Sequence, residues 1–261
     1  MSDTPYVLRR DDGPVATLTL NRGDRFNPLS RPMIAALRAE LDRLAEDRSI
    51  RVVVLAALGR GFSAGHDLKE MRAHAGDDEW QRQLFSECSA MMLELTRLPQ
   101  PVIARVHGIA TAAGCQLVST CDLAVASEKA KFALPGVNIG VFCSTPAVGV
   151  ARNVGRKRVM ELLLTGQPVS AQTALEWGLV NRVVPEDRLD AEIAGFTELI
   201  VARSAAAITL GKQVFYQQVD AGVDAAYRTA AEAMTCNMAY ADAAEGIDAF
   251  LGKRPAVWQD R

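Results

Sequence analysis

The sequence predicts an α/β core followed by an all-helical C-terminal region. Up to about residue 186, short β-branched apolar runs alternate with segments that carry apolar residues at helical spacing. Beyond that point the strand signals stop and only helical patterns follow. Hydrophobic residues make up 49% and charged residues 23% of the 261 residues, which is typical of a globular protein with a full core. Strands that alternate with helices favour a layered α/β core.

The first strand and helix have clear boundaries. "VATLTLN" (15–21) alternates polar and apolar residues, as a half-buried strand does. A helix is expected over 30–47, since Ser30 can cap it, Pro32 suits its first turn and apolar residues recur at helical spacing. "RVVVLAAL" (51–58) is continuously apolar, which indicates a strand buried on both faces.

The middle of the chain continues the alternation. A second amphipathic helix is expected over 80–98, and Pro99 ends it. A short helix is expected over 170–178, with Ser170 at its start and Gly178 just past its end. Further short strands are expected at 101–108, 121–127 and 180–185.

The last quarter reads as helices only. Three of them are expected at 187–203, 205–219 and 223–240. A fourth is expected over 242–253, where Asp242 and Glu245 have capping-box spacing. We therefore expect a core over 1–195 and a helical C-terminal region over 196–261.

Charge and composition exclude several classes of function. A net charge of −2 and a pI near 6.0 give no overall basic field for nucleic acid or an anionic membrane. No apolar run reaches the roughly 18 residues of a membrane helix, and the N-terminal residues resemble no targeting segment, so the cytoplasm is the expected location. The five cysteines lack C-x-x-C spacing, so no metal site is expected and reduced thiols are favoured.

"GFSAG" (61–65) matches the G-x-S-x-G motif of serine hydrolases. That motif needs a strand that runs directly into a strained turn, and here "GRGF" intervenes between strand and serine. The order of residues is also unfavourable, because the last histidine is His107 and the base of a hydrolase usually comes late in the chain. A serine esterase or thioesterase is therefore the least favoured alternative.

Two loops of small residues offer a different chemistry. "SAGHDLKEM" (63–71) opens a helix with Asp67 in its first turn, and "TAAGC" (111–115) precedes an apolar helix that begins near Gln116. Small residues leave backbone N–H groups uncovered at a helix start, where they can bind an anion or a carbonyl oxygen. Two such donors aimed at one oxygen form an oxyanion hole.

With these motifs the sequence resembles the crotonase (enoyl-CoA hydratase/isomerase) superfamily. The likeness covers almost the whole chain, from "LTLNRGDRFNPLS" through "GFSAGHDLKEM" and "HGIATAAGCQLVSTCDLAVASEKAKFALPGVNIG" to "ELLLTGQPVSAQTALEWGLVNRVVP" and "GIDAFLGKRPAVW". Within the superfamily, "PGVNIGVFCSTPAVGVARNVGRK" and the tail look closest to one subgroup.

The resemblance implies a crotonase-like ββα spiral core with a helical C-terminal region that builds a homotrimer or homohexamer. It implies an acyl-coenzyme A thioester as ligand and no separate cofactor, since coenzyme A enters as part of the substrate. The thioester oxygen would accept from the backbone N–H groups of His66 and Ala113. The His66 side chain is expected to be a wall of the pocket rather than a base. The Ala113 methyl stands where the family commonly has glycine and narrows the approach.

Hydratases of this family use two glutamates, and both are missing here. The resemblance places Gln116 at the first position and Gly136 at the second. Glutamine does not ionise near neutral pH and glycine has no side chain. General acid–base groups typically contribute about 10²–10⁴-fold each, so hydration is expected to be weak or absent.

Few other residues are candidates for chemistry. Cys143 follows the second glutamate position, and its thiol could titrate near neutral pH if perturbed; a buried structural thiol is the favoured alternative. Asp67 and Asp122 are expected to cap or brace turns. The residues expected to contact the acyl-CoA are Arg25, Ala64, His66, Asp67, Leu68, Lys69, Ala113, Gly114 and Lys253. Arg22 and Arg254 are further candidate cations for the coenzyme A phosphates, with solvated surface charge as the alternative.

Three classes of function stay open on the sequence alone. The first is an acyl-CoA enzyme of the crotonase type with unusual acid–base equipment. The second is a non-catalytic acyl-CoA binder, and the third is the serine hydrolase. Acyl chain length and reaction cannot be read from the residues.

Overall fold

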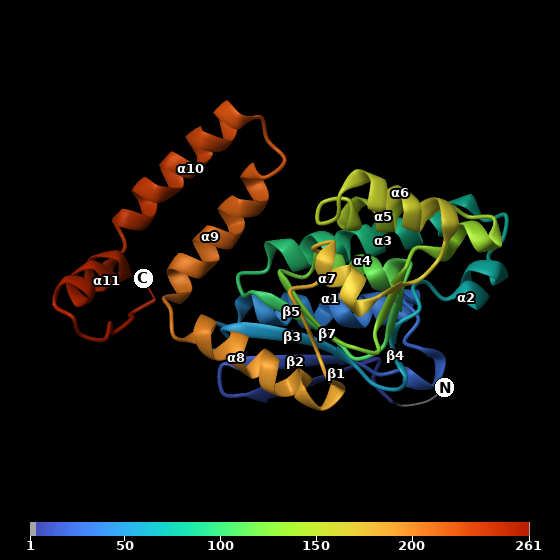
Figure 1. The fold of residues 1–261 in the computed structure, drawn as a ribbon, viewed down its shortest axis with the longest axis horizontal. Coiled ribbons are helices and arrows are strands. Elements are labelled where there is room, and N and C mark those ends of the chain that lie inside the picture. Colours follow the sequence, from blue (N-terminus) through green and yellow to red (C-terminus); the bar gives the residue numbers. More distant parts are fainter. Residues whose placement is uncertain (1–3, 261) are drawn as a thin grey trace.

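The computed structural model describes residues 4–260 and contains two sheets surrounded by helices (Figure 1). The larger, six-stranded sheet has the order β1-β2-β3-β5-β7-β10 and comprises Val7–Asp12, Val15–Leu20, Val52–Ala57, Val102–Val106, Leu123–Ser127 and Arg182–Val184. The smaller has the order β4-β6-β8-β9 and comprises Gly61–Ser63, Ile109–Thr111, Lys131–Ala133 and Val169–Ser170. All pairings are parallel except β1–β2 and β8–β9.

The described part of the chain contains eleven α-helices. In the core they are α1 Arg31–Glu46, α2 Leu68–Ala73, α3 Asp78–Arg97, α4 Ala113–Thr120, α5 Ser144–Val150, α6 Arg156–Thr165, α7 Ala171–Glu176 and α8 Leu189–Val201. The C-terminal ones are α9 Ala205–Gln218, α10 Val223–Met238 and α11 Ala241–Leu251. Short 3₁₀ turns occupy Gly23–Arg25, Pro135–Ile139 and Glu186–Arg188.

The two sheets are built from repeated ββα turns, as the family resemblance implied. Strand β3 enters the large sheet and β4 the small one before α2; β5 and β6 do the same before α4, and β7 and β8 before the Pro135–Ile139 turn. Each ββα turn therefore adds one parallel strand to the large sheet and another to the small sheet. The helix starts that follow β4 and β6 consequently lie next to each other, since β4 pairs with β6.

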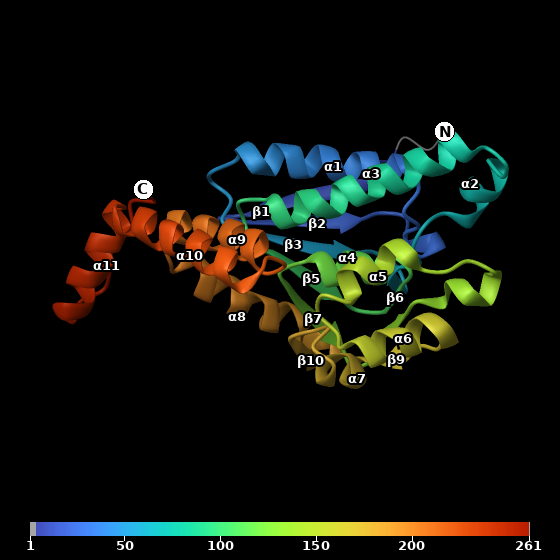
Figure 2. The same cartoon turned by 90° about the horizontal axis from the view of Figure 1, so that it is seen from above.

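Strand β3 is apolar throughout because both of its faces are buried. Val53 and Leu55 pack in the main core, which also contains the apolar faces of α1 and α3. Val52 and Val54 point the other way and pack with Leu189 of α8. Figure 2 shows the large sheet between α1 and α3 on one side and α8 on the other. Because both faces are covered, the expected polar alternation is absent.

Several boundary predictions are confirmed and one is wrong. Ser30 caps α1 by accepting from the N–H of Met33, and Ser170 caps α7. Gly178 takes the left-handed conformation just after α7, with φ of 84°. The capping box at Asp242 is wrong: Tyr240 is the N-cap, and the Asp242 carboxylate instead accepts from the N–H groups of residues 259 and 260.

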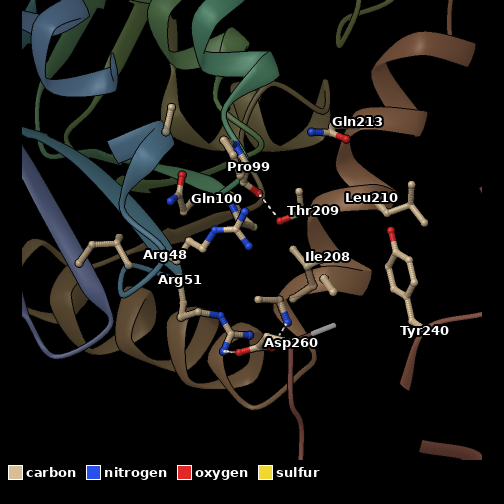
Figure 3. Close-up of a pocket in the computed structure, with 15 residues that line it drawn as sticks. Arg48, Arg51, Pro99, Gln100, Ile208, Thr209, Leu210, Gln213, Tyr240 and Asp260 are labelled. Atoms are coloured by element: carbon tan, nitrogen blue, oxygen red, sulfur yellow. Dashed lines mark hydrogen bonds and ion pairs between the residues drawn. The ribbon is translucent and has the colours of Figure 1, made fainter. Parts of the chain in front are cut away.

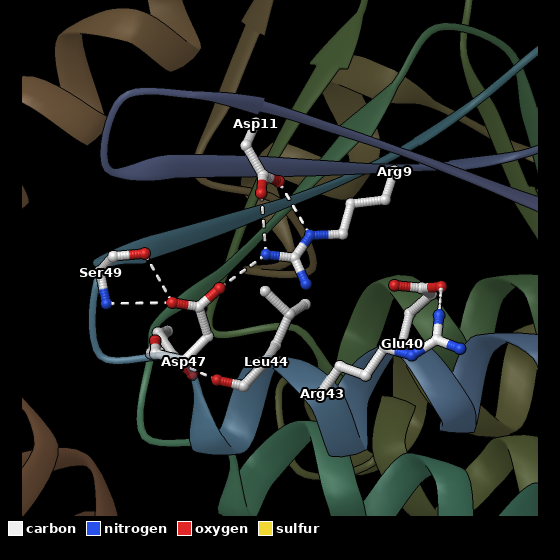
Figure 4. A network of polar contacts seen from close by, with 8 residues as sticks. Arg9, Asp11, Glu40, Arg43, Leu44, Asp47 and Ser49 are labelled. Carbon is white, nitrogen blue, oxygen red and sulfur yellow. Dashed lines mark hydrogen bonds and ion pairs between the residues drawn. The ribbon is translucent and has the colours of Figure 1, made fainter.

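The first hairpin is fastened to the end of α1 by an arginine. Arg9 on β1 donates to both carboxylate oxygens of Asp11 and to Asp47, with N–O distances of 2.8–2.9 Å. Asp47 in turn accepts from Ser49 (Figure 4). Strand β1 has no apolar alternation in its sequence "VLRRDD", which is why the sequence did not indicate it. Its polar face is exposed, and Arg9 supplies the contact that an apolar side chain would otherwise make.

The C-terminal helices extend away from the core. Helix α8 packs on the large sheet, so the expected boundary after residue 195 falls inside a core helix; the chain turns by 104° between α8 and α9. Helices α10 and α11 lie at the end of the molecule opposite α2 (Figure 1). Within residues 4–260 no single helix has the length and apolar composition of a membrane span, and one bent pair, 186–201 with 205–218, meets that measure.

A buried ion pair attaches α9 to the core. The Lys212 ammonium donates to a carboxylate oxygen of Asp122 at 2.7 Å, and to the carbonyl oxygens of Leu95 and Gln100. The other Asp122 oxygen accepts from Tyr216, also on α9. Asp122 was expected to cap or brace a turn; instead it accepts from the Val102 N–H at the start of β5 and from two residues of α9, a helix far along the chain.

Candidate functional site

A cavity of about 440 Å³ lies where the starts of α2 and α4 meet the loop that leads into α5. Four segments line it: 64–71, Phe85 on α3, Ala112–Ala113, and 135–146. Of the residues expected to act or bind, six lie on this lining: Ala64, His66, Leu68, Ala113, Gly136 and Cys143. The small-residue loops and the second glutamate position are thus brought to one cavity.

The backbones of the two small-residue loops, 63–65 and 111–115, pack directly against each other. A Cβ placed on Gly114 would lie 2.3 Å from the carbonyl oxygen of Ser63, and one on Gly65 would lie 3.0 Å from the nitrogen of Ala113. Between them Ala112 takes φ of 50° and ψ of −122°, a conformation that costs an alanine about 1–3 kcal/mol. Strain of this size persists only where the surroundings fix the backbone.

This packing leaves two donors at the cavity. Ala113 is the first residue of α4, so its N–H has no acceptor within the helix. In the described structure, neither the Ala113 N–H nor the His66 N–H donates a hydrogen bond to another protein group. Both residues line the cavity from adjacent loops. The arrangement fits two donors that converge on one oxygen of a ligand.

The His66 side chain brings an imidazole ring to this lining. Its Nε2 is buried without a hydrogen-bond partner, and the ring lies edge-on to Phe85 with centroids 5.4 Å apart. Burial lowers the pKa of His66 to about 4, because the charged imidazolium loses its hydration. The imidazole is therefore neutral at neutral pH.

The two glutamate positions differ in what they would allow. Gln116 is buried one turn into α4, does not line the cavity, and its Oε1 has no hydrogen-bond partner. Gly136 lies on the lining but has no room for a side chain, since a Cβ would meet the Val141 carbonyl oxygen at 2.5 Å and Cys143 Sγ at 2.9 Å. The loop folded over Gly136 fills the space that a second carboxylate would need.

Cys143 is part of that closed loop. Its Sγ accepts from the Gly136 N–H at 3.3 Å, and the side chain is 6% exposed. Burial raises the pKa of the Cys143 thiol, and the N–H donated by Gly136 opposes the rise only in part. A thiol held protonated at neutral pH cannot accept the substrate proton. The geometry therefore fits a structural thiol better than a base.

Ser63 of the G-x-S-x-G match is buried and occupied. It has no exposed surface, its Oγ donates to the carbonyl oxygen of Asn27 at 2.9 Å, and Gly65 N–H donates to it. An acyl-transfer nucleophile must be reached by its substrate. The structure thus excludes Ser63 as a hydrolase nucleophile.

The expected coenzyme A contacts are only partly gathered at the cavity. Arg25 and Asp67 line a separate small cavity of about 180 Å³ beside it. Asp67 caps α2 by accepting from the N–H groups of Lys69 and Glu70, as expected. The Lys69 side chain is exposed at the start of α2 and does not line the cavity.

The remaining cations are engaged by protein groups or lie away from the cavity. Arg22 lines the same small cavity as Arg25, where it stacks on Tyr6 and donates to backbone carbonyls. Arg254 pairs with Glu245. Lys253 follows α11, and this helix lies at the end of the molecule away from α2 (Figure 1). Lys253 does not line the cavity of its own chain.

The apolar wall of the cavity was missed from the sequence. Met71 and Phe85 form one side, and the loop residues Ile139, Val141 and Phe142 form the other, each of these three 45–57% exposed. The signal was present as the apolar run "IGVF" after a short turn, where a surface loop would be polar. Exposed apolar side chains at the mouth of a cavity indicate a ligand with an apolar part.

A larger cavity of about 670 Å³ lies away from these donors, between the end of α1, the loop before β5 and the start of α9. Figure 3 shows Arg48 and Arg51 on one side and Thr209, Gln213 and Tyr240 on the other. Arg51 is engaged by Asp260 and by the carbonyl oxygen of Arg203. None of the expected site residues lines this space, so size alone does not mark the site.

The ββα architecture and a cavity with two backbone donors define a protein of the crotonase type. A model of the enoyl-CoA hydratase/isomerase family matches residues 10–261, and the chain belongs to this family. Its sequence is 45% identical over 250 residues to mouse "enoyl-CoA hydratase domain-containing protein 3, mitochondrial", covering 96% of this chain and 83% of that protein. This group is the subgroup that the segment after Leu134 and the tail indicated.

Solved structures agree with this assignment. An enoyl-CoA hydratase from Mycobacterium smegmatis superposes with a TM-score of 0.96 at 54% identity, over 98% of this chain and 99% of that one. Human enoyl-CoA hydratase domain-containing protein 3 gives 0.93 at 43% identity, over 97% and 100%. The crotonase fold predicted from the sequence is confirmed.

The expected location is wrong. The mouse, zebrafish and human relatives are all named as mitochondrial proteins, which contradicts the cytoplasmic expectation. That expectation rested on the lack of a long apolar run and on the composition of the N-terminal residues, and both are weak indicators of where a protein acts.

Proposed function

We propose that this protein binds acyl-coenzyme A thioesters and polarises the thioester oxygen with the backbone N–H groups of His66 and Ala113. The observation that carries this is the convergence of two unpaired N–H groups on one cavity with an apolar wall. Two donors aimed at the oxygen stabilise the negative charge that develops on it when water adds to the β-carbon of an enoyl group or when a proton leaves the α-carbon. The apolar wall suits the acyl chain.

Hydration of a conjugated double bond is proposed to be slow. Water must be deprotonated and the α-carbon protonated, and positions 116 and 136 offer no ionisable group for either step. Cys143 is held as a neutral thiol and His66 as a neutral imidazole without a carboxylate partner. An acyl-CoA binder without rapid chemistry is the second candidate, and the loop closed over Gly136 favours it.

The first experiment blocks one donor. Ala113→Pro deletes the N–H at the first position of α4, a position that helices tolerate for proline, and its Cδ occupies the place of the lost hydrogen. Because both the hydrogen bond and the room for the oxygen are lost, titration calorimetry with butyryl-CoA should show affinity falling by at least roughly tenfold. Circular dichroism must first show that the variant is folded, since Ala112 before it has a strained backbone. Arg156→Pro is the matched control, because Arg156 opens α6 and does not line the cavity. Equal affinities in the two variants would contradict the proposed donor.

The second experiment measures chemistry directly. Wild-type protein with crotonyl-CoA should turn over well below the roughly 10 s⁻¹ that is typical of enzymes. Mass spectrometry of products from a panel of enoyl-, hydroxyacyl- and saturated acyl-CoAs separates an enzyme from a binder. Rapid hydration would show that another residue moves the protons, and would overturn the role given to the missing glutamates.

We also propose that the chain assembles as a homotrimer or homohexamer. Helix α10 has no buried residue, and the C-terminal helices expose Phe215, Tyr227, Met234, Met238 and Phe250, each at 53–83% of its surface. Apolar faces of this extent are normally covered by a partner. The position of Lys253 supports the same assembly, since its side chain does not line the cavity of its own chain.

A further inference from the structure

The serine of the G-x-S-x-G match lies between the two loops that carry the backbone donors. Ser63 has no exposed surface. A Cβ on Gly114 would meet the Ser63 carbonyl oxygen at 2.3 Å and its Cβ at 2.8 Å, so Ser63 packs directly on the start of α4. Its Oγ accepts from the Gly65 N–H at 3.3 Å, one residue before His66. Ser63 therefore belongs to one donor loop and packs on the other.

The Ser63 hydroxyl is held in turn by a buried asparagine. Its Oγ donates to the Asn27 carbonyl oxygen at 2.9 Å. Asn27 has no exposed surface and takes φ of 49°, a positive value that asparagine tolerates better than most residues. The Asn27 side chain donates to the carbonyl oxygens of Leu58 and Gly61 and accepts from the Arg22 N–H. The hydroxyl is thus fixed as a donor on one side and as an acceptor on the other.

A third contact sets the direction of the donor itself. The Leu29 N–H donates to the Gly65 carbonyl oxygen at 2.7 Å. That carbonyl and the His66 N–H belong to one peptide group, which is planar and trans, so the two point in opposite directions. Fixing the carbonyl towards Leu29 therefore directs the His66 N–H away from Leu29. The orientation of this single peptide group decides where the donor points.

We propose that Ser63 is a positioning residue of the oxyanion hole: its hydroxyl fixes the Gly65–His66 peptide so that the N–H groups of His66 and Ala113 converge on one oxygen. This inference rests on the proposed acyl-CoA binding. Without the hydroxyl, the Gly65 N–H loses its acceptor, and glycine has no side chain to restrict rotation of its backbone. Ser63 is buried, touches no substrate and moves no proton. Its loss should weaken the hold on the thioester oxygen and spare the rest of the ligand.

The test compares a thioester with the matching thioether. Butyryl-CoA and S-butyl-CoA have the same chain length, but only butyryl-CoA has an oxygen for the two N–H groups. The ratio of their dissociation constants, measured by titration calorimetry, reports on the donors and cancels the contacts made by the rest of the ligand. In wild type the thioester should bind roughly tenfold more tightly, as expected for two hydrogen bonds of modest net strength.

Ser63→Ala should lower this ratio by roughly threefold or more, because one donor is no longer aimed at the oxygen. Ser127→Ala is the matched control. Ser127 is also fully buried, its Oγ donates to the His107 carbonyl oxygen at 2.9 Å and accepts from the Lys129 N–H at 3.2 Å, and it does not line the cavity. Both variants lose the same kinds of hydrogen bond, so urea unfolding should show similar losses of stability while only Ser63→Ala changes the ratio.

Two further measurements support the assignment. The infrared carbonyl stretch of bound butyryl-CoA should lie at a higher frequency in Ser63→Ala than in wild type or Ser127→Ala, because weaker hydrogen bonds polarise the carbonyl less. Ser63→Cys keeps only a weak donor and acceptor, so it should lower the ratio as well. It replaces the alanine variant if that variant does not fold.

Each outcome decides a separate question. A wild-type ratio in the Ser63 variants, or an equal fall in Ser127→Ala, overturns the role of Ser63 and leaves acyl-CoA binding intact. Equal affinity of wild type for thioester and thioether contradicts the two donors, and the inference with them. Absence of binding by both ligands overturns the proposed function itself.

Discussion

Residue 136 has no room for a side chain. The carbonyl oxygen of Val141 and the Cys143 thiol occupy the volume that a side chain would need. Gly136→Ala should therefore destabilise the fold by roughly 1–3 kcal/mol, the usual range for overpacking. Urea unfolding measures this change in free energy.

Gly195→Ala is the control for this prediction, because nothing lies within 4 Å of a Cβ at that position in α8. It should be neutral or stabilising by up to about 1 kcal/mol, since alanine is the better helix former. A Gly136→Ala variant as stable as Gly195→Ala would mean that the loop opens easily. Restoring a hydratase by adding a glutamate there would then become feasible.

Burial of His66 predicts that the free energy of unfolding decreases as the pH falls. Its pKa is about 4 in the folded chain and near 6.5 when unfolded, so above pH 6.5 neither state binds the proton. As pH falls from 6.5 towards 4, the unfolded state binds a proton that the folded state refuses. Stability should fall by up to about 1.4 kcal/mol per pH unit over this window.

The His66→Phe variant isolates that contribution. Urea unfolding of wild type and variant at pH 7, 6 and 5 gives two slopes, and their difference is the part due to His66. Other groups that titrate in this range affect both proteins alike. Parallel slopes would show that the ring is hydrated and titrates normally.

At the residue scale, prediction succeeded for the two small-residue loops at 63–65 and 111–115, which the structure brings to one cavity. That positions 116 and 136 replace two glutamates rests on the family resemblance and stays a prediction. The positive φ of Ala112 could not be predicted, because alanine disfavours this conformation. Ala112 packs against the loop that contains Gly65, which is distant in the sequence. The closed loop over Gly136 likewise depends on residues five and seven positions away.

Among the elements, α9 depends on one buried charge. Lys212→Met leaves the Asp122 carboxylate, at 17% side-chain exposure, with only the Val102 N–H and the Tyr216 hydroxyl. Removing one partner of a buried pair is costly, and we expect a loss of up to about 3 kcal/mol in the free energy of unfolding. Chemical denaturation monitored by circular dichroism provides the measurement.

The double variant Lys212→Met with Asp122→Asn separates charge from packing. If the penalty comes from an uncompensated carboxylate, the double variant should be clearly more stable than the sum of the single changes predicts. Strict additivity would instead assign the loss to the lysine's contacts with the carbonyl oxygens of Leu95 and Gln100.

Helices and strands were likewise predicted where the signal is local and missed where distant packing holds them. The long amphipathic helices and the apolar strand β3 carry their periodicity in their own residues, and each was found within a few positions. Helices α5 and α6 were not indicated, since "STPAVGV" contains proline and glycine and is held by packing on α4. The capping box failed because the tail, rather than the helix start, uses the Asp242 carboxylate.

At the scale of the molecule, the exposed face of α10 should control assembly. Tyr227→Glu with Met234→Glu places two charges on residues that are 74% and 61% exposed in the single chain. We expect the mass in light scattering to drop to that of a monomer, while the core keeps its circular dichroism. Leu164→Glu on α6, at 62% exposure, is the control and should leave the mass unchanged.

A single-chain mass for the wild type at micromolar concentration would contradict this prediction. It would also leave Lys253 without a neighbouring chain's ligand to contact.

The two donors at the cavity are main-chain groups, and this has a genetic consequence. Every codon except those for proline encodes an N–H at positions 66 and 113, so nearly all point mutations there preserve the donors. Side chains around them can therefore be replaced, one after another, without losing the ability to hold a carbonyl oxygen. A lineage with such a site can discard its acids and bases and still inherit a usable binding pocket from which other chemistry can evolve.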